Sequence, residues 1–67
     1  MNEKILQQIS RCRKQKNISI SELAEKANIS YSYLYQLENN RKVNPSLEIL
    51  DKIANALEMD ISLLFIK

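Results

Sequence analysis

The side chains best suited to contact another molecule are gathered in one short stretch, and they are hydrogen-bonding or aromatic rather than nucleophilic. If the stretch is helical, its spacing places them on one face, opposite Leu34 and Leu37. A glutamine amide can bond adenine bidentately, a serine hydroxyl can bond several bases, and a tyrosine ring suits a thymine methyl group. Such a combination is suited to the edges of base pairs. Its members are Tyr31, Ser32, Tyr35 and Gln36.

Tyrosines alternate along this stretch, at Tyr31, Tyr33 and Tyr35. Leaving three large rings in water is costly unless a partner covers them. A purely structural interpretation is also open, in which Tyr33 is half-buried against the core while Tyr31 and Tyr35 only cover the surface. We favour contact with a partner for Tyr31 and Tyr35, and packing for Tyr33.

The residue types needed for catalysis or metal binding are scarce in this chain. It contains no histidine, no glycine and one cysteine, so nucleophile–base pairs, phosphate loops and metal clusters have few candidate residues. Cys12 falls on the apolar side of its segment, where a small buried residue is the favoured interpretation and a redox sensor the alternative. We therefore predict a protein that is not an enzyme, with no metal, no cofactor and no small-molecule ligand.

Length and composition predict one small domain over residues 1–67. The chain has 67 residues, of which 45% are hydrophobic, and a single proline, a composition that argues against disorder. No apolar run approaches the roughly 20 residues needed to cross a membrane, and residues 1–4 lack the layout of a signal peptide. A lone cysteine suits a reducing interior, so we expect a cytoplasmic protein with no membrane partner.

Charge is distributed unevenly along the chain. Residues 1–42 carry eight basic and four acidic side chains, a net charge of +4, whereas residues 43–67 carry two basic and four acidic ones, a net charge of −2. The first part of the chain can therefore face a polyanion, and the last part cannot.

Apolar residues recur with a helical period, which predicts an all-α fold of five helices. The first helix is expected from Glu3 to Lys16, and a short fifth helix is expected after a cap at Asp60. The fourth begins near Asn44 or Ser46, and the sequence does not decide which of the two caps it. Its predicted buried stripe consists of Leu47, Leu50, Ala54 and Leu57.

The second and third helices are expected to be joined by a very short turn. Ser19 can cap the second helix, with Glu22 completing a capping box. Asn28 tolerates the left-handed backbone that ends a helix, and Ser30 can cap a third helix over about residues 31–38. Helices joined so closely cross steeply, so we predict a helix-turn-helix over about residues 19–38.

Several short motifs stand in an order and at distances that resemble a known family. They are SISELAEKANIS at 19–30, Tyr33-Leu34, Leu37-Glu38-Asn39, Asn44-Pro45-Ser46-Leu47, Leu57, Asp60 and Leu64-Phe65. Together they resemble the lambda-repressor-like, or Xre-type, helix-turn-helix regulators, and among these most closely the phage and SinR-type repressors. The resemblance covers nearly the whole chain. It implies a five-helix domain that binds operator DNA as a dimer, with the helix at about residues 31–38 in the major groove.

The resemblance also implies which residues contact DNA. Base contacts are expected from Ser30, Tyr31, Ser32, Tyr35 and Gln36. Phosphate contacts are expected from Asn39, Arg41 and Lys42, and the amide groups near Ser19 and Ser21 can hold a further phosphate. The family often has glutamine at the position of Ile20, so that contact is not carried over. For Arg11, Lys14 and Lys16 a solvated helix face is favoured over DNA contact.

Two further features concern packing and assembly. Arg13 and Glu38 match a family ion pair that orients the third helix, the alternative being that each is exposed and independent. The last segment is unusually apolar, which suggests a partner. We expect a two-fold dimer through it, the alternative being a frayed, weakly packed end. The predicted dimer residues are Ile61, Leu63, Phe65 and Ile66.

The sequence as a whole therefore predicts a sequence-specific double-stranded DNA-binding regulator. A repressor is favoured, acting as a homodimer in the cytoplasm of a bacterium or as a phage-encoded protein. The competing class is a protein-interaction module of helical fold, such as an antitoxin, which should bind duplex DNA weakly and without sequence preference.

Overall fold

The described part of the chain is entirely helical. The computed structural model describes the backbone of residues 2–39 and 44–65 and the side chains of residues 5–39 and 44–64. Over these ranges no strand forms, and the all-α class is confirmed. The elements are the α-helices α1 (Asn2–Gln15), α2 (Ile20–Ala27), α3 (Tyr31–Asn39) and α4 (Leu47–Ala56), followed by a 3-10 helix η1 (Ile61–Phe65).

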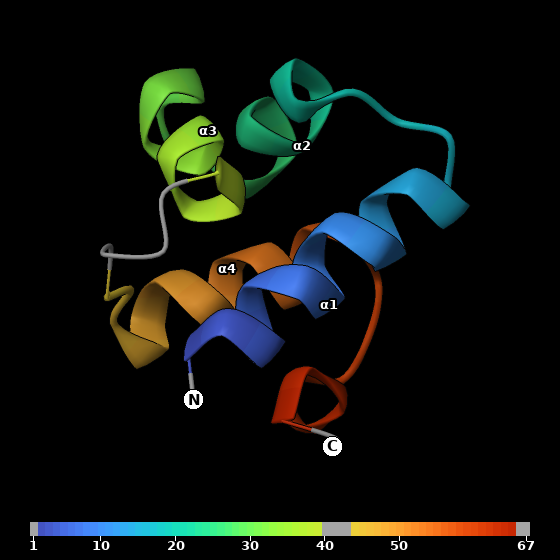
Figure 1. Cartoon of the computed structure of the whole chain (residues 1–67). Coiled ribbons are helices and arrows are strands. Elements are labelled where there is room, and N and C mark those ends of the chain that lie inside the picture. Colours follow the sequence, from blue (N-terminus) through green and yellow to red (C-terminus); the bar gives the residue numbers. More distant parts are fainter. Residues whose placement is uncertain (1, 40–43, 66–67) are drawn as a thin grey trace.

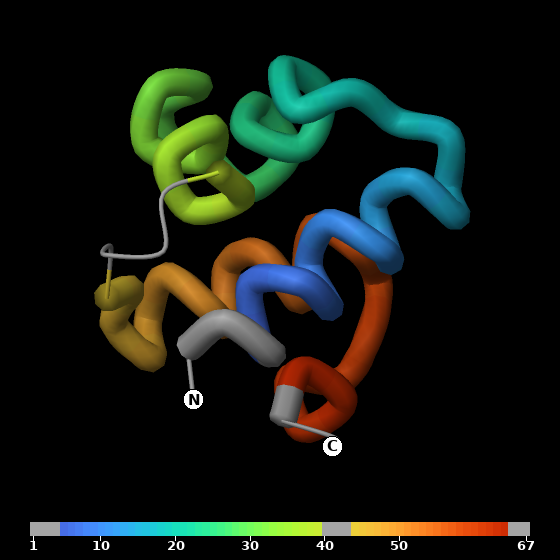
Figure 2. The backbone as a smooth tube through the Cα atoms, viewed as in Figure 1, coloured from blue at the N-terminus to red at the C-terminus, as the bar shows by residue number. Residues whose placement is uncertain are grey.

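The arrangement leaves α3 at the edge of the molecule with neighbours on one side. α3 contacts α2 and α1, α2 also contacts α4, and η1 contacts both α1 and α4 (Figure 1). The smoothed trace shows the tight turn that places α2 and α3 side by side and the longer path by which the chain returns from α4 to η1 (Figure 2). One long side of α3 is therefore available to a partner.

A single core joins all five elements. Burial of a leucine or isoleucine side chain contributes about 2 kcal/mol, so the leucines of α3 fix its inner side firmly. The side chains without exposed surface are Ile9, Leu23, Leu34, Leu37, Ile53, Leu57 and Leu64.

Helices α1, α2 and α4 end at residues with left-handed backbone, although the chain has no glycine. The φ angles are 58° at Asn17, 59° at Asn28 and 57° at Glu58. In each case the next amide donates back to a carbonyl one turn earlier, as in a Schellman ending. These bonds are Ile18 N to Arg13 O, Ile29 N to Ala24 O, and Met59 N to Ala54 O. The ending at Asn28 was predicted, whereas those at Asn17 and Glu58 were not.

The prediction of a fifth α-helix is wrong, because residues 61–65 form the 3-10 helix η1. The Leu63 amide donates to the Asp60 carbonyl at 3.0 Å, the i to i+3 spacing of that tighter helix. Asp60 does cap the segment, since its Oδ1 accepts the Ser62 amide at 2.9 Å. Bonds from the Ser62 amide and then its hydroxyl lower the pKa of the Asp60 carboxyl below its usual value, so the cap is charged at neutral pH.

Helix α4 differs from its prediction at its first turn. Ser46 is the cap, because its Oγ accepts the Ile49 amide at 3.2 Å. Leu47 was predicted to be buried but is 66% exposed. It is the first residue of α4, one turn before the buried Leu50, so it projects beyond the end of the core. Ile53, which the predicted stripe omitted, is fully buried instead.

Candidate nucleic-acid interface

The turn between α2 and α3 holds the two helices close together. Only Asn28, Ile29 and Ser30 separate them. The left-handed Asn28 reverses the chain, and Ser30 begins α3 by accepting the Tyr33 amide on its Oγ at 3.0 Å. Ala24 and Ala27 are buried in α2, and their small side chains allow α3 to approach. Two helices joined by a three-residue turn thus lie at the predicted place, and their steep crossing stays a prediction.

Helix α3 has one buried face and one exposed face. Leu34 and Leu37 are buried, and Tyr33 is half-buried against the core. The opposite face is exposed and carries the side chains that the sequence singled out, namely Tyr31, Ser32, Tyr35, Gln36 and Asn39. Ser30, just before the helix, is exposed as well. The structure thus brings the predicted base-contacting residues together on one surface, and their contact with DNA stays a prediction.

Two rings on this exposed face touch each other. The centroids of Tyr31 and Tyr35 lie 6.1 Å apart with an interplanar angle of 28°. Both side chains remain half exposed, at 52% and 49%. The pair therefore presents an aromatic surface on the exposed side of α3, which also carries smaller polar groups.

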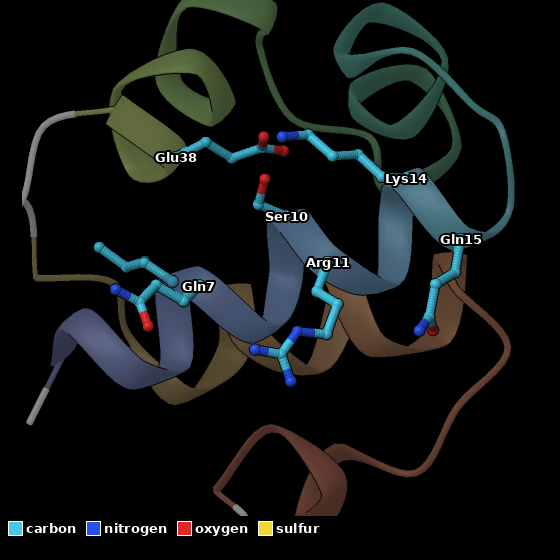
Figure 3. Close-up of a pocket in the computed structure, with 7 residues that line it drawn as sticks. Gln7, Ser10, Arg11, Lys14, Gln15 and Glu38 are labelled. Carbon is cyan, nitrogen blue, oxygen red and sulfur yellow. The ribbon is translucent and has the colours of Figure 1, made fainter.

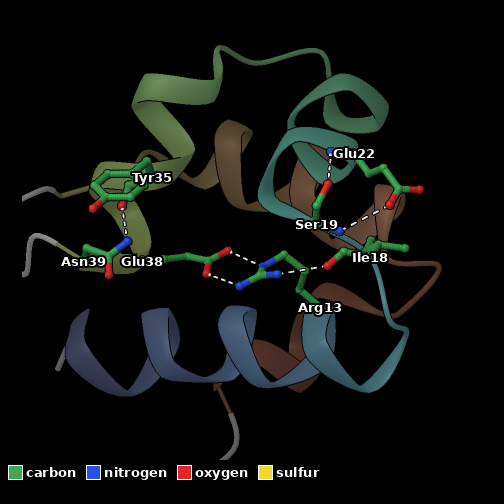
Figure 4. Close-up of polar contacts among 7 residues, drawn as sticks. All are labelled: Arg13, Ile18, Ser19, Glu22, Tyr35, Glu38 and Asn39. Atoms are coloured by element: carbon green, nitrogen blue, oxygen red, sulfur yellow. Dashed lines mark hydrogen bonds and ion pairs between the residues drawn. The ribbon is translucent and has the colours of Figure 1, made fainter.

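The N-terminus of α2 is capped as predicted. Ser19 Oγ accepts the Glu22 amide at 3.0 Å, and Glu22 Oε1 accepts the Ser19 amide at 3.3 Å (Figure 4). Ser19 and Ser21 are exposed, so a phosphate can reach this end of α2. The carboxylate of Glu22 lies at the same place, however, and it opposes an approaching anion.

The predicted ion pair between Arg13 and Glu38 is present and is bidentate. Arg13 Nε donates to Glu38 Oε2 at 2.8 Å, and Nη2 donates to Oε1 at 2.9 Å. Only 11% of the Arg13 side chain and 4% of the Glu38 side chain are exposed. Nη1 of the same guanidinium donates to the Ile18 carbonyl at 2.9 Å (Figure 4). One arginine on α1 therefore fixes both the end of α3 and the segment that leads into α2.

Comparison with known proteins decides the family. A profile described as helix-turn-helix matches residues 9–64, which is most of the chain. The chain belongs to the helix-turn-helix family.

Several helix-turn-helix proteins are closely similar. The HTH-type transcriptional regulator SinR of Bacillus subtilis (strain 168) is 44% identical over 55 residues, covering 82% of this chain and 50% of SinR. The immunity repressor protein of Bacillus phage phi105 is 45% identical over 56 residues, covering 84% of this chain and 38% of the repressor. The chain thus spans at most half of these curated relatives.

Solved structures show the same helix-turn-helix fold. The N-terminal DNA-binding domain of SinR from Bacillus subtilis superposes with a TM-score of 0.87 at 40% identity, covering 97% of this chain and 94% of that one. A crystal structure of SinR in complex with DNA gives 0.84 at 42% identity, covering 92% of this chain and 98% of that one. The all-helical arrangement described above is therefore that of the SinR DNA-binding domain.

The residues just past the helix-turn-helix are partly described. Asn39 Nδ2 donates to the Tyr35 carbonyl at 2.9 Å. Tyr35 and Asn39 both lie on the side of α3 away from the Arg13–Glu38 pair (Figure 4). Arg41 and Lys42, the other predicted phosphate contacts, lie outside the described residues.

A shallow groove of about 520 Å³ lies between α1 and the end of α3. Lys14 and Glu38 extend toward each other across it, while Arg11 and Gln15 point outward from α1 (Figure 3). Its single carboxylate is the one already paired with Arg13. The lining residues are Leu6, Gln7, Ser10, Arg11, Lys14, Gln15 and Glu38. The preference for a solvated helix face over DNA contact at Arg11, Lys14 and Lys16 stays a prediction.

The predicted dimer surface is partly apolar and exposed. Leu63 is 41% exposed and Ile61 is half-buried, while the side chains of Phe65 and Ile66 lie outside the description. The exposed Leu47 adjoins this surface, because it lines a second groove of about 360 Å³ together with Glu48, Asp51 and Ile61. Leu47 was predicted to be buried, although its place directly after Ser46, one of the two candidate caps, was a usable signal of exposure.

The described residues also bear on metal binding and on membrane insertion. Among them, no cluster of three or more histidine, cysteine, aspartate or glutamate side chains is placed to hold a metal ion. Within the same ranges, each helix is too short or too polar to reach across a membrane.

Proposed function

We propose that this helix-turn-helix chain is a sequence-specific double-stranded DNA-binding regulator, and specifically a repressor. The observation that carries the proposal is the division of α3 into two faces. Leu34 and Leu37 anchor it, while its polar and aromatic side chains face outward at the edge of the molecule. A helix so placed has the dimensions to enter the major groove with its first residues against the bases.

The similar proteins support this assignment. SinR is named as a transcriptional regulator, the phage relative as an immunity repressor, and a SinR structure contains DNA. The helix-turn-helix family consists of DNA-binding regulators and is not an enzyme class. We accordingly assign this chain a binding role and no catalytic one.

Base reading is assigned to the central residues of the exposed face. Gln36 can donate to and accept from adenine in the major groove, and Ser32 can bond to more than one base. Ser30, Tyr31 and Tyr35 complete the reading surface. Their exposure leaves their polar atoms accessible to a duplex.

Phosphate contacts are assigned to the flanks of α3. The assigned groups are the amides at the start of α2, near Ser19 and Ser21, and Asn39 at the end of α3, with Arg41 and Lys42 following it in the chain. These contacts set affinity and its salt dependence, whereas the bases set specificity.

We further propose that the chain binds as a homodimer in the cytoplasm, through the surface of Ile61, Leu63, Phe65 and Ile66. The exposure of Leu63 beside Ile61 supports a partner at this surface. A two-fold pair would present two copies of α3 about 34 Å apart on one side of the duplex.

Selection of bound sequences from a pool of random duplexes tests the proposal directly. We expect a two-fold symmetric consensus whose affinity falls steeply as salt increases. Enrichment of no sequence, with equal and weak binding to all duplexes, would instead identify a protein-interaction module. The measurement needs only the chain itself and requires no knowledge of the operator.

A further inference from the structure

The stacked tyrosines are the part of the exposed face of α3 that hydrogen bonding leaves unexplained. Tyr31 and Tyr35 come from successive turns of the helix, with centroids 6.1 Å apart and planes inclined by 28°. About half of each side chain is exposed, at 52% and 49%. Anchoring of α3 is supplied by Leu34 and Leu37, which are fully buried. The pair therefore exposes apolar surface that the fold itself does not use.

Stacking prepares this surface for a ligand. A tyrosine side chain loses little conformational entropy when it is fixed, because it has only two side-chain torsions. Because the two rings already lie stacked in the unbound chain, a ligand that uses this arrangement requires less rearrangement of them. The polar neighbours Ser32 and Gln36 are exposed on the same face. The apolar surface of the two rings therefore lies beside hydrogen-bonding groups.

One apolar group projects from the base edges in the major groove, and it is the C5 methyl of thymine. A methyl group packs against an aromatic face without requiring a hydrogen bond. We infer that the Tyr31–Tyr35 stack is a receptor for the 5-methyl group of a pyrimidine. The inference rests on the proposed function. It adds that each half-site carries thymine at the position facing the stack, next to the base that Gln36 reads.

Uracil provides the test, because it pairs as thymine does and lacks only the methyl group. Each thymine of the selected duplex is replaced by uracil in turn, and the dissociation constant of the chain is measured by fluorescence anisotropy. We expect one or two adjacent positions in each half-site to lose roughly threefold to fivefold in affinity, the effect of removing one buried methyl group. Two further duplexes carry cytosine or 5-methylcytosine at those positions, and the methylated duplex should bind more tightly than the unmethylated one.

Variants assign the effect to the rings. Tyr31→Ala and Tyr35→Ala should bind thymine and uracil duplexes equally, because each removes one ring of the stacked pair. Tyr31→Phe and Tyr35→Phe remove only the hydroxyls and should keep the thymine–uracil difference, whatever their overall affinity. Tyr33→Phe is the matched control, because Tyr33 packs against the core from the same helix. Thermal unfolding followed by circular dichroism establishes that each variant is folded.

The outcomes separate this inference from the proposed function. A symmetric consensus bound equally well with uracil at every position would overturn the inference and leave sequence-specific binding intact. Loss of the thymine–uracil difference in the phenylalanine variants would also overturn it, because the hydroxyls would then be responsible. Binding without any preference among duplexes would overturn the proposed function and the inference with it. A thymine–uracil difference lost only in the alanine variants confirms the inference.

Discussion

Two chemically different groups of residues meet DNA in the proposed complex, and each predicts a different mutant behaviour. Gln36 is exposed on α3 and is assigned to a base, whereas Arg41 is assigned to phosphate. Gln36→Ala should weaken binding to the selected operator by about tenfold or more, because a bidentate base contact is lost, and should leave random duplexes unaffected. Arg41→Ala should weaken all duplexes alike and reduce the salt dependence.

Titration of both variants against operator and random DNA checks this division. Equal losses on the two duplexes for Gln36→Ala would remove its assignment as a base reader. A loss confined to the operator for Arg41→Ala would remove its assignment to phosphate.

Glu58 has a left-handed backbone conformation that glycine would adopt more easily. Its φ of 57° lies in the left-handed region, where a residue with a Cβ is disfavoured by about 1–2 kcal/mol. Glu58→Gly should relieve this cost at the end of α4 and offset it only in part by greater freedom when unfolded. We expect a rise in the free energy of unfolding of about 0.5–1 kcal/mol, or about 3–6 °C in Tm.

Asn28→Gly is the matched control for Glu58→Gly. Asparagine already tolerates the left-handed conformation, so the gain at residue 28 should be smaller. Equal gains at the two positions, or a lower Tm for Glu58→Gly, would contradict the explanation based on backbone conformation.

Residue-level predictions succeeded where the deciding interaction is local. The capping box of Ser19 and Glu22, the left-handed Asn28 and the cap at Ser30 each depend on side chains a few positions apart. Glu58 could not be predicted, because glutamate has no preference for that backbone and the packing around Met59 and Leu57 imposes it.

At the scale of elements, the N-terminus of α2 combines two opposing charges. Its amides favour an anion, whereas the Glu22 carboxylate that completes the capping box opposes one. Glu22→Gln keeps an oxygen that can accept the Ser19 amide and removes the negative charge. We expect it to bind DNA about twofold to fivefold more tightly at low salt, with the gain shrinking as salt rises.

Glu25→Gln is the control for Glu22→Gln, since Glu25 is exposed on the same helix but lies a turn further from its N-terminus. A similar gain in both variants would indicate a general charge effect. An unchanged affinity in Glu22→Gln would place the phosphate away from the start of α2.

The Arg13–Glu38 pair connects α1 to the end of α3, and its energy depends on which partner is removed. Arg13→Ala leaves the carboxylate of Glu38 unpaired in a site where 4% of its side chain is exposed, at a cost of about 3–5 kcal/mol. The total stability expected for a chain of this size is roughly 3–10 kcal/mol. Arg13→Ala should therefore lose a large fraction of the free energy of unfolding and have a clearly lowered urea midpoint.

The double variant Arg13→Met with Glu38→Leu tests whether the instability of Arg13→Ala comes from the unpaired carboxylate of Glu38. Apolar side chains of similar size can replace a buried ion pair at little cost, so urea unfolding should recover most of the wild-type stability. A double variant as unstable as Arg13→Ala would show that the bond from Arg13 to the Ile18 carbonyl, rather than the ion pair, carries the effect.

Element boundaries and packing were predictable to different degrees. Helix α1 was expected over Glu3 to Lys16 and is found over Asn2–Gln15. The periodicity of apolar residues identifies a helix but does not show where the core ends, so Leu47 was wrongly placed inside it. A short final segment was expected to be α-helical, yet five residues between Asp60 and the end of η1 favour the tighter helix. The partners Arg13 and Glu38 stand far apart in sequence, and the family resemblance supplied that pairing.

At the scale of the whole molecule, the size of one chain bears on how it reads a symmetric operator. The chain extends 25 × 23 × 20 Å, whereas two recognition helices on one side of a duplex are about 34 Å apart. One copy can therefore occupy only one half-site. A symmetric consensus consequently requires a second copy. The apolar surface around Leu63 belongs to the last part of the chain, which carries a net negative charge, whereas the first part is basic.

Leu63→Lys tests where the two copies meet. A lysine at this exposed apolar position should disrupt the dimer, because its charge would be buried without a partner. We expect the variant to sediment as a monomer and to lose affinity for the full palindrome. Its affinity for an isolated half-site should stay within about twofold of wild type, because salt screens a single added charge that does not contact the duplex. Asn55→Lys adds the same charge at an exposed position of α4 and serves as control. If Leu63→Lys binds the palindrome as the control does, the copies do not meet through Leu63, and the proposed dimer surface is wrong at this residue.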